Sequence, residues 1–308
     1  MEEALRYDLD LEQFWKDNEL AMRDNCFYEG APQVAFGLAF WDEDLFTELD
    51  VPGEPHGDNP LHLLVEYRKR YNDKAERIIG KRILAEGLRN WEVYPKIKMH
   101  GEVLGGQYVK VDGMYWLESD IKTPKQLEAM LNRVDKMDLR AFILPEGWDK
   151  KKKQIYEETG VPFEPYFYGR EVRGPVTLAM SIYGVENTIL LMYDEPDLTH
   201  RFFSTIENVL LGYIRIMDEE AGPGVEAGNY GYMFNDDNCC MLTPELYEEF
   251  AFPVLQHVFE YTSPTPGYHR YQHSDSEMAH LLPVLGRLNL TGCNFGPNVL
   301  LDQIRKYM

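Results

Sequence analysis

The stretch YHRYQHSDSEMAHLLPVLGRLNLTGCNFGP, from Tyr268 to Pro297, decides the fold class of this chain. Its pattern predicts a strand that ends at His273, then a helix, then a second strand over Leu288–Thr291. Ser274 and Glu277 have the S-x-x-E spacing of a capping box, so we expect the helix to begin one residue after Ser274. The helix would bury one apolar face, which is formed by Met278, Leu281, Leu282 and Leu285.

Polar side chains gather at the carboxyl ends of these two strands. His273 ends the first strand and Asp275 opens the helix, while the second strand delivers Cys293 and Asn294. In α/β proteins this edge of a parallel sheet is where ligands bind and catalysis occurs. Imidazole, carboxylate and thiolate are all zinc ligands, so His273, Asp275 and Cys293 form a predicted metal site. Each also has an ordinary alternative: a hydrogen-bonded strand-end histidine, an acid favoured by the helix dipole, and a small buried thiol.

The composition is that of a large, acidic, globular chain. Its 308 residues, 44% of them hydrophobic, suffice for one large barrel or two modest domains. The net charge of −21 argues against nucleic acid as a partner, because phosphates require a basic footprint. No apolar run approaches the roughly 20 residues of a membrane helix, and the N-terminus lacks the order of a signal peptide. Four cysteines, two of them adjacent, do not indicate a disulfide framework, so we expect a cytoplasmic protein without a membrane partner.

Strand and helix patterns alternate from Phe163 to the end of the chain. Strands are expected near Tyr166–Tyr168, at Tyr230–Phe234 and in the stretch quoted above, each followed by a helix. This alternation predicts an α/β fold with a parallel sheet, and a (β/α)8 TIM-type barrel is its commonest closed form. Because the sequence stops at a helix, we expect the last strand–helix units of the barrel to be missing from this chain. We expect a single barrel domain over residues 1–308, with residues 1–90 as a divergent helical region packed on it.

Two adjacent carboxylates, Asp236 and Asp237, directly follow the strand at Tyr230–Phe234. Neighbouring acids can raise one pKa and exchange protons with a substrate, so both are candidate catalytic residues together with His273. Successive side chains of a strand point to opposite faces, however, so one of the two acids could serve only to turn or cap the chain. Either acid is also a candidate metal ligand.

Two arginines lie at the expected strand end before Gly174. Arg170 or Arg173 could hold a substrate carboxylate there, such as that of a methoxylated aromatic acid, because a guanidinium donates two parallel hydrogen bonds. The alternative is that they pair with local acids such as Glu164 or Glu171.

Aromatic and imidazole side chains complete the predicted substrate site. Tyr168 and Tyr232 would supply walls for a flat apolar ligand, unless they belong to the core. His100 lies in the glycine-rich segment KMHGEVLGG, which is not a phosphate-binding fingerprint because no strand-to-helix context surrounds it.

Several motifs in the second half of the chain resemble one known family. In order and spacing, four motifs resemble those of the uroporphyrinogen decarboxylase superfamily. They are GPVTLA, DEPDL, NDD before TPELYEEFAFPVL, and HSD followed by NFGP. The resemblance extends from Gly174 to Met308 and is poor in residues 1–90. It implies a single (β/α)8 barrel and one of two activities, which are decarboxylation of uroporphyrinogen and methyl transfer linked to cobalamin and zinc.

The charge of residues 31–46 separates these two activities. The decarboxylase binds a porphyrinogen with eight carboxylates through arginines near its N-terminus, whereas APQVAFGLAFWDEDLF contains no Lys or Arg. In the methyltransferase branch, a His-x-Cys pair and a later Cys hold zinc. Here the pair reads His273-x-Asp275, and the later Cys would fall beyond Met308. A carboxylate is a harder zinc ligand, which suits activation of an ether or amine methyl donor.

The resemblance therefore implies a zinc-dependent methyltransferase that moves a methyl group from a small O- or N-methyl donor to a corrinoid carrier protein. A homodimer is left open. One alternative is a carboxy-lyase in which Asp236 or Asp237 acts without metal, and the other is a non-catalytic barrel that binds a tetrapyrrole or corrinoid. No Lys or Arg occurs between Asp24 and Tyr67, and this acidic stretch is either a solvated face or a surface that attracts a basic partner.

Overall fold

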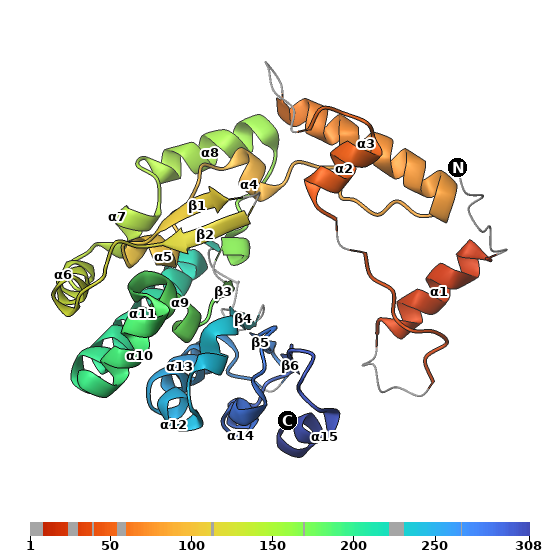
Figure 1. Cartoon of the computed structure of the whole chain (residues 1–308). Helices are drawn as coiled ribbons and strands as arrows, with labels where there is room; N and C mark the ends of the chain where they lie inside the picture. The colour runs from red at the N-terminus through yellow and green to blue at the C-terminus, as the bar shows by residue number, and fades with distance from the viewer. Residues whose placement is uncertain are drawn as a thin grey trace. The chain divides into compact units, whose positions relative to one another are not determined.

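The helices and strands of the chain fall into two units, Met1–Val93 and Tyr94–Met308 (Figure 1). The computed structural model describes residues 9–23, 30–38, 40–53, 60–111, 114–168, 170–221, 231–265 and 267–308. The N-terminal unit contains the helices α1 (Leu11–Ala21), α2 (Asp42–Glu48), α3 (Pro60–Ile79) and α4 (Asn90–Val93).

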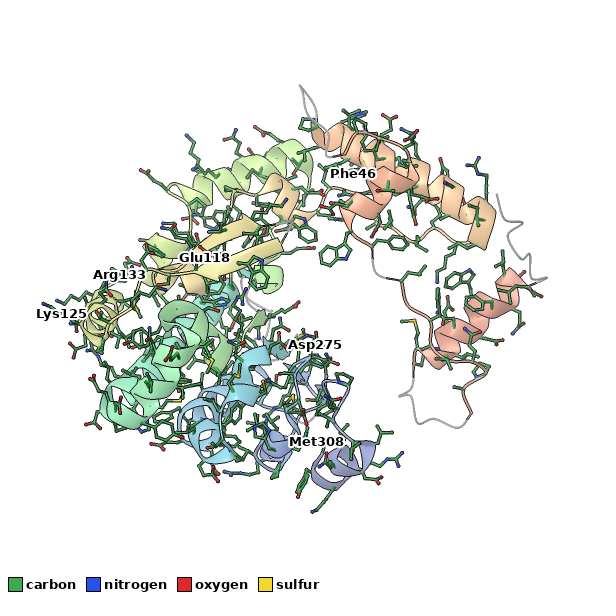
Figure 2. The ribbon with its side chains drawn as sticks, in the orientation of Figure 1. Phe46, Glu118, Lys125, Arg133, Asp275 and Met308 are labelled. Atoms are coloured by element: carbon green, nitrogen blue, oxygen red, sulfur yellow. The ribbon has the colours of Figure 1, made fainter. Side chains whose placement is uncertain are left out.

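A small core and one buried ion pair hold α2, α3 and α4 together. Leu64 of α3 packs with Leu45 and Phe46 of α2, and Phe46 is labelled in Figure 2. Arg68 of α3 is fully buried, forms an ion pair with Glu92 of α4, and donates to a backbone carbonyl. A buried guanidinium needs such partners, so this pair fixes α4 against α3.

The C-terminal unit contains two sheets. β1 (Gln107–Val111) and β2 (Met114–Glu118) form an antiparallel hairpin that the sequence pattern did not predict. A parallel sheet follows the order β3 (Glu171–Arg173), β4 (Tyr232–Asn235), β5 (Arg270–His273) and β6 (Gly292–Cys293). The helices are α5 (His100–Val103), α6 (Pro124–Val134), α7 (Leu139–Ile143), α8 (Trp148–Thr159), α9 (Pro175–Tyr183), α10 (Val185–Asp194), α11 (Pro196–Ala221), α12 (Pro244–Leu246), α13 (Phe252–Thr262), α14 (Leu282–Leu285) and α15 (Leu301–Tyr307).

Several helices begin and end where local sequence signals predict. Thr123 Oγ1 accepts a hydrogen bond from the Gln126 backbone N–H and starts α6. Gly160 ends α8 in the left-handed conformation, with φ 71°. The long α11 buries the apolar side chains that its periodicity places on one side: Leu198, Phe202, Ile206, Val209, Leu210, Tyr213 and Met217.

The helix expected directly after Ser274 does not form. Ser274 Oγ accepts a hydrogen bond from the Ser276 backbone N–H over 3.3 Å, which makes a tight turn in place of the predicted capping box. The chain stays irregular as far as Met278 and then makes a short helical turn before α14. The four apolar side chains predicted to share a buried face are nevertheless all fully buried: Met278, Leu281, Leu282 and Leu285.

Two predicted strands are displaced along the chain. The strand expected over Leu288–Thr291 lies at Gly292–Cys293, because Asn289 adopts a left-handed conformation with φ 52° and ends the preceding helical turn. The strand expected near Tyr166–Tyr168 is a 3-10 helix, and β3 follows it. The strand at β4 is confirmed from Tyr232 onward, while Tyr230 lies outside the described residues.

The parallel sheet confirms the α/β class. Its four strands occur in chain order, and helices separate them along the sequence. Among the described residues, no further strand pairs with the outer edge of β3 or of β6, so closure into a (β/α)8 barrel stays a prediction.

No helix in the described part of the chain is by itself long and apolar enough to span a membrane. By length and composition α9 and α10 pass together, but they meet at a bend of 103°.

Candidate metal-binding site at the carboxyl edge of the sheet

The carboxyl ends of β3, β4 and β5 place three polar residues in one row. Arg173 pairs with Asn235, and Asn235 pairs with His273, in the register of the parallel sheet. Because side chains alternate between the two faces of a strand, these three share a face, which we call the open face. All three are half-buried. The opposite side, which we call the helix face, carries buried side chains that pack toward the helices: Val172, Phe234 and Gln272.

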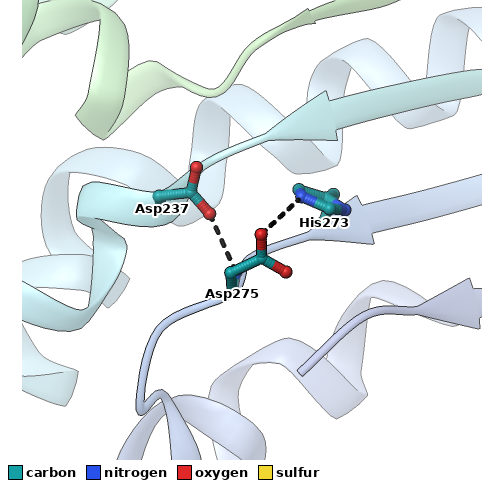
Figure 3. A group of neighbouring side chains, drawn as sticks. All are labelled: Asp237, His273 and Asp275. Carbon is teal, nitrogen blue, oxygen red and sulfur yellow. Dashed lines mark hydrogen bonds and ion pairs between the residues drawn. The ribbon is translucent and has the colours of Figure 1, made fainter. Parts of the chain in front are cut away.

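Asp237, His273 and Asp275 form a group with the geometry of a metal site (Figure 3). One potential ligand atom from each residue lies within 4.8 Å of the others. His273 Nε2 lies 3.7 Å from Asp275 Oδ2, and the Asp275 backbone N–H donates to Asp237 Oδ1 over 2.9 Å. Both aspartates are exposed, so a solvent ion can reach the group.

Serine hydrogen bonds hold the loop that carries Asp275, which is labelled in Figure 2. The Ser276 hydroxyl donates to the Asp237 carbonyl oxygen over 2.6 Å, and the Gly296 backbone N–H donates to the Ser276 carbonyl over 3.2 Å. A Cβ atom on Gly296 would lie 2.4 Å from that carbonyl oxygen, so glycine is required for the close approach. The loops after β4, β5 and β6 are thereby tied together.

Asn294 belongs to this group, although the sequence pattern predicts only its place at the strand end. Its Nδ2 lies 3.2 Å from His273 Nδ1 and 2.7 Å from Asp275 Oδ1. Since an amide nitrogen can only donate, His273 Nδ1 accepts, and the neutral ring carries its proton on Nε2. Asn294 therefore orients both the imidazole and the carboxylate. The signal that could have found it is strand alternation, once the strand is placed at Gly292–Cys293.

Cys293 lies outside the group. In the register it pairs with Gln272 of the helix face, so its side chain is turned away from His273. Burial raises the pKa of the Cys293 thiol to about 12, which keeps the thiol protonated at neutral pH. The structure thus brings together His273 and Asp275 of the predicted ligand set, with Asp237 in the third position in place of Cys293.

The adjacent acids Asp236 and Asp237 have opposite environments. Asp236 is fully buried, and its Oδ1 accepts a hydrogen bond from the Thr177 backbone N–H at the start of α9 over 2.7 Å. Burial raises the pKa of Asp236 to about 6, although hydrogen bonds from Thr177 and Val176 act in the opposite direction. Of the two predicted catalytic acids, Asp237 is the one that the structure places beside His273.

Two predicted substrate-binding residues, His100 and Arg173, interact through the charge of Arg173. His100 of α5 is 2% exposed, and its ring meets Tyr213 edge-on with the ring centroids 6.1 Å apart. Burial and, second, the charge of Arg173 lower the pKa of His100 to about 4, so the ring is neutral at neutral pH. Burial raises the pKa of Tyr108, while the charge of Arg173 and a hydrogen bond with it act in the opposite direction.

The other three predicted substrate-binding residues are placed differently. Arg170 pairs with Asp218 of α11 over 2.7 Å, and this ion pair replaces the local pairing expected for it. Tyr232 is on the helix face, 1% exposed, and burial raises the pKa of its hydroxyl. Burial raises the pKa of Tyr168 to about 12, and its ring stacks on Phe163 with the centroids 5.3 Å apart.

The segment that contains the parallel sheet has known relatives. Residues 171–308 match the sequence model of the family described as Uroporphyrinogen decarboxylase (URO-D). This segment belongs to the URO-D superfamily. The URO-D match begins at the first residue of β3 and includes Asp237, His273, Asp275 and Asn294. It covers less than half of the 308 residues and confirms the superfamily that the motifs in the same segment predicted.

One solved structure, a methyltransferase from Methanosarcina mazei, is similar to the chain at 14% identity and a TM-score of 0.43. The similarity covers 81% of this chain and 66% of that structure, so this chain spans just under two thirds of its length. A similarity of this degree does not identify a reaction. No curated protein sequence matches the chain.

Proposed function

We propose that this protein is a methyltransferase of the URO-D superfamily with a (β/α)8 barrel fold. It would use a zinc ion at Asp237, His273 and Asp275 to activate a small O- or N-methyl donor, and the acceptor would be the corrinoid of a separate carrier protein. Transfer would leave the donor as the alcohol or amine, which takes up one proton, while the methyl group goes to the reduced cobalt. A cytoplasmic location and an acidic surface that attracts the carrier belong to the same proposal.

The observation that carries the proposal is the grouping of one imidazole and two carboxylates at the carboxyl edge of the sheet. Three protein ligands that leave an open position are typical of catalytic zinc. The two aspartates are exposed, so a donor atom could reach an ion held between them. Zinc bound there would act as a Lewis acid on the heteroatom that carries the methyl group.

The three residues fit a zinc ion by chemistry and by their supporting contacts. An N, O, O donor set accepts borderline and hard divalent ions, and the ligand atoms are already within 4.8 Å of one another. Asn294 supports the imidazole and one carboxylate from behind, as outer partners of metal ligands commonly do. Binding through His273 Nε2 would move the ring proton to Nδ1, so Asn294 would have to turn its amide oxygen toward Nδ1 to keep its contact with the ring.

Charge favours methyl transfer over decarboxylation of a porphyrinogen. Residues 31–46 contain no Lys or Arg, and the chain as a whole has a net charge of −21, so a substrate with many carboxylates would be repelled. Asp236 is fully buried and bonded to the start of α9, so it is not turned to the open face. These features leave Asp237 and its neighbours as the groups that could meet a small substrate.

The test is zinc binding by the purified protein. We expect about one zinc ion per chain by mass spectrometry of the metal, and saturable binding by calorimetry after the protein is stripped with chelator. His273→Ala should lose this binding. The matched control is His257→Ala, because His257 Nδ1 also lies beside a carboxylate, 2.9 Å from Glu207, but forms no group of three among the described residues.

Each outcome separates the proposed function from its alternatives. Zinc that binds equally well to His273→Ala would place the ion elsewhere. Protein that binds no zinc would overturn the zinc-dependent reaction and leave a metal-free carboxy-lyase or a non-catalytic tetrapyrrole or corrinoid binder. Turnover of methylated donors with reduced cobalamin as acceptor then distinguishes an enzyme from a binding protein.

A further inference from the structure

Among the described residues of this strongly acidic chain, Arg173 has no acidic partner. The sequence contains 52 Asp and Glu against 31 Lys and Arg, yet no carboxylate oxygen of the described residues lies within 4.0 Å of an Arg173 side-chain nitrogen. Arg170, three residues earlier, pairs with Asp218. Because Arg173 is half-buried at the carboxyl end of β3, its guanidinium is available to an anion at the open face.

The His100 ring senses the charge of Arg173, and among the described residues both of its nitrogens are unpaired. The side chain is 2% exposed, and neither Nδ1 nor Nε2 has a hydrogen-bond partner within the described part of the chain. Leaving a buried polar group unsatisfied is costly, so an unpaired buried imidazole indicates a missing partner. The neutral ring has one N–H to donate, and the Tyr108 hydroxyl on the same side interacts with Arg173. Three groups that can bind an anion thus come together from α5, β1 and β3.

The open face between Arg173 and His273 has the length of a small molecule. The two residues are on strands separated by one other strand, so about 4.8 Å per strand spacing separates their backbones by roughly 10 Å. Asn235 lies between them in the row, and Met233 and Tyr271 are paired two residues before Asn235 and His273. A thioether and a phenol ring, both half-buried, provide an apolar floor suited to an aromatic ring.

We propose that the methyl donor is a monocarboxylate about one aromatic ring long, and that its carboxylate binds Arg173 beside His100 and Tyr108. This inference rests on the proposed function, because the metal group defines the other end of the donor. The carboxylate anchors one end at β3, and the methylated heteroatom lies at Asp237, His273 and Asp275. Arg173 and His100 are substrate-binding residues in this arrangement and take no part in methyl transfer itself.

The surrounding acids restrict the donor to a single negative charge. Glu171 is on the same face two residues before Arg173, where it accepts a hydrogen bond from Asn235 Nδ2 over 3.2 Å. Asp237 and Asp275 stand at the other end of the row. In the metal-free protein used for the test, a second carboxylate on the donor would meet these acids with no described Lys or Arg beside them, so dicarboxylates should bind more weakly than monocarboxylates.

The test measures binding without metal or turnover. The probe is 4-methoxybenzoate, with 4-methoxybenzamide as its neutral counterpart, and affinity is measured by calorimetry and ligand-observed NMR in the presence of chelator. Wild-type protein should bind the acid at least tenfold more tightly than the amide, as expected for loss of a charge-assisted pair. Arg173→Gln should weaken binding of the acid at least tenfold and leave the amide unchanged, and Arg173→Lys should lie between.

Controls separate this inference from the proposed function. Arg201→Gln removes an arginine that pairs with Asp135 on the surface, and it should leave both affinities unchanged. If zinc fails to bind but binding of 4-methoxybenzoate still depends on Arg173, the inferred carboxylate site is supported and the zinc-dependent reaction is excluded. Equal affinity for acid and amide, an Arg173→Gln variant that binds the acid normally, or no binding of the acid overturns the inference.

Discussion

Gly174 and Asp236 are so close that only glycine fits between β3 and α9. A Cβ atom at Gly174 would lie 2.2 Å from both Cβ and Cγ of Asp236. The Asp236 carboxyl reaches past this glycine to accept the hydrogen bond from the Thr177 backbone N–H. The first turn of α9 is therefore attached to the end of β4 by a side chain that needs the missing Cβ.

Gly174→Ala is expected to lower the free energy of unfolding by at least about 2 kcal/mol, because the added methyl group displaces Asp236 in a packed interior. Urea unfolding followed by circular dichroism measures the change. Gly87→Ala is the matched control, since a Cβ there would have no heavy atom within 4 Å. A Gly174→Ala protein as stable as the control would show that Asp236 can move away without loss.

The pH dependence of stability should report the buried Asp236. Burial raises its pKa in the folded protein to about 6, above the ordinary value of 3.8. Between these values the folded state holds a proton that the unfolded state has released, so the free energy of unfolding falls as pH rises. Relative to Asp236→Asn, wild type should lose about 3 kcal/mol between about pH 4 and pH 6.

The comparison with the variant is necessary because another buried group titrates in the same range. His100, whose pKa is lowered to about 4, makes the fold more stable as pH rises and opposes Asp236. Urea midpoints of wild type and Asp236→Asn, measured across this range, cancel the contribution of His100. Parallel pH profiles for the two proteins would contradict the burial of an ionisable Asp236.

Asn294→Ala should weaken zinc binding by about 10- to 100-fold while His273→Ala abolishes it, because Asn294 orients two ligands without being one. Calorimetric titration with zinc measures both. Asn132→Ala, a change at an exposed asparagine of α6, serves as the control. Nitrogen NMR of the His273 ring adds a structural readout, with the proton on Nε2 before zinc is added and on Nδ1 afterwards. Zinc affinity unchanged in Asn294→Ala would remove Asn294 from the site.

Glu92→Gln is expected to destabilise the N-terminal unit by about 3 kcal/mol or more, because it leaves the fully buried guanidinium of Arg68 without a counter-charge. Chemical unfolding of the whole chain, followed by tryptophan fluorescence, tests this. The exposed pair of Lys16 and Glu12 offers the comparison, and Glu12→Gln should leave stability unchanged. An equal change in the free energy of unfolding for the two variants would mean that water reaches the Arg68 guanidinium.

Helices with strong local signals could be predicted from the sequence, whereas the two shortest strands of the parallel sheet, β3 and β6, could not. The capping box at Thr123 and the glycine at the end of α8 act through neighbouring residues, so the sequence alone reveals them. Ser274 carries the same kind of capping signal, yet contacts between loops override it. Ser276 bonds to the loop after β4, and Gly296 bonds to Ser276, which no local pattern encodes.

The candidate site could be predicted in part for the same reason. His273 and Asp275 follow from the rule that ligands gather at strand ends, and β5 lies where its pattern predicts. The affinity of a thiolate for zinc favours Cys293 over Asn294 as the predicted site residue. Which of the two faces His273 depends on where β6 begins, and that strand has only two residues.

Because side chains alternate between the two faces, the register of β3, β4 and β5 decides which residues reach the open face. Loss or gain of one residue inside β5 would present Gln272 in place of His273 at the open face, and would send the imidazole toward the helices. The same change in β3 would replace Arg173 by Val172. Insertions after Asn294 carry no such penalty for the row. In an alignment with other sequences, a gap placed within these strands would therefore put buried apolar residues where the polar site residues belong. A gap in the following loops would leave the site intact.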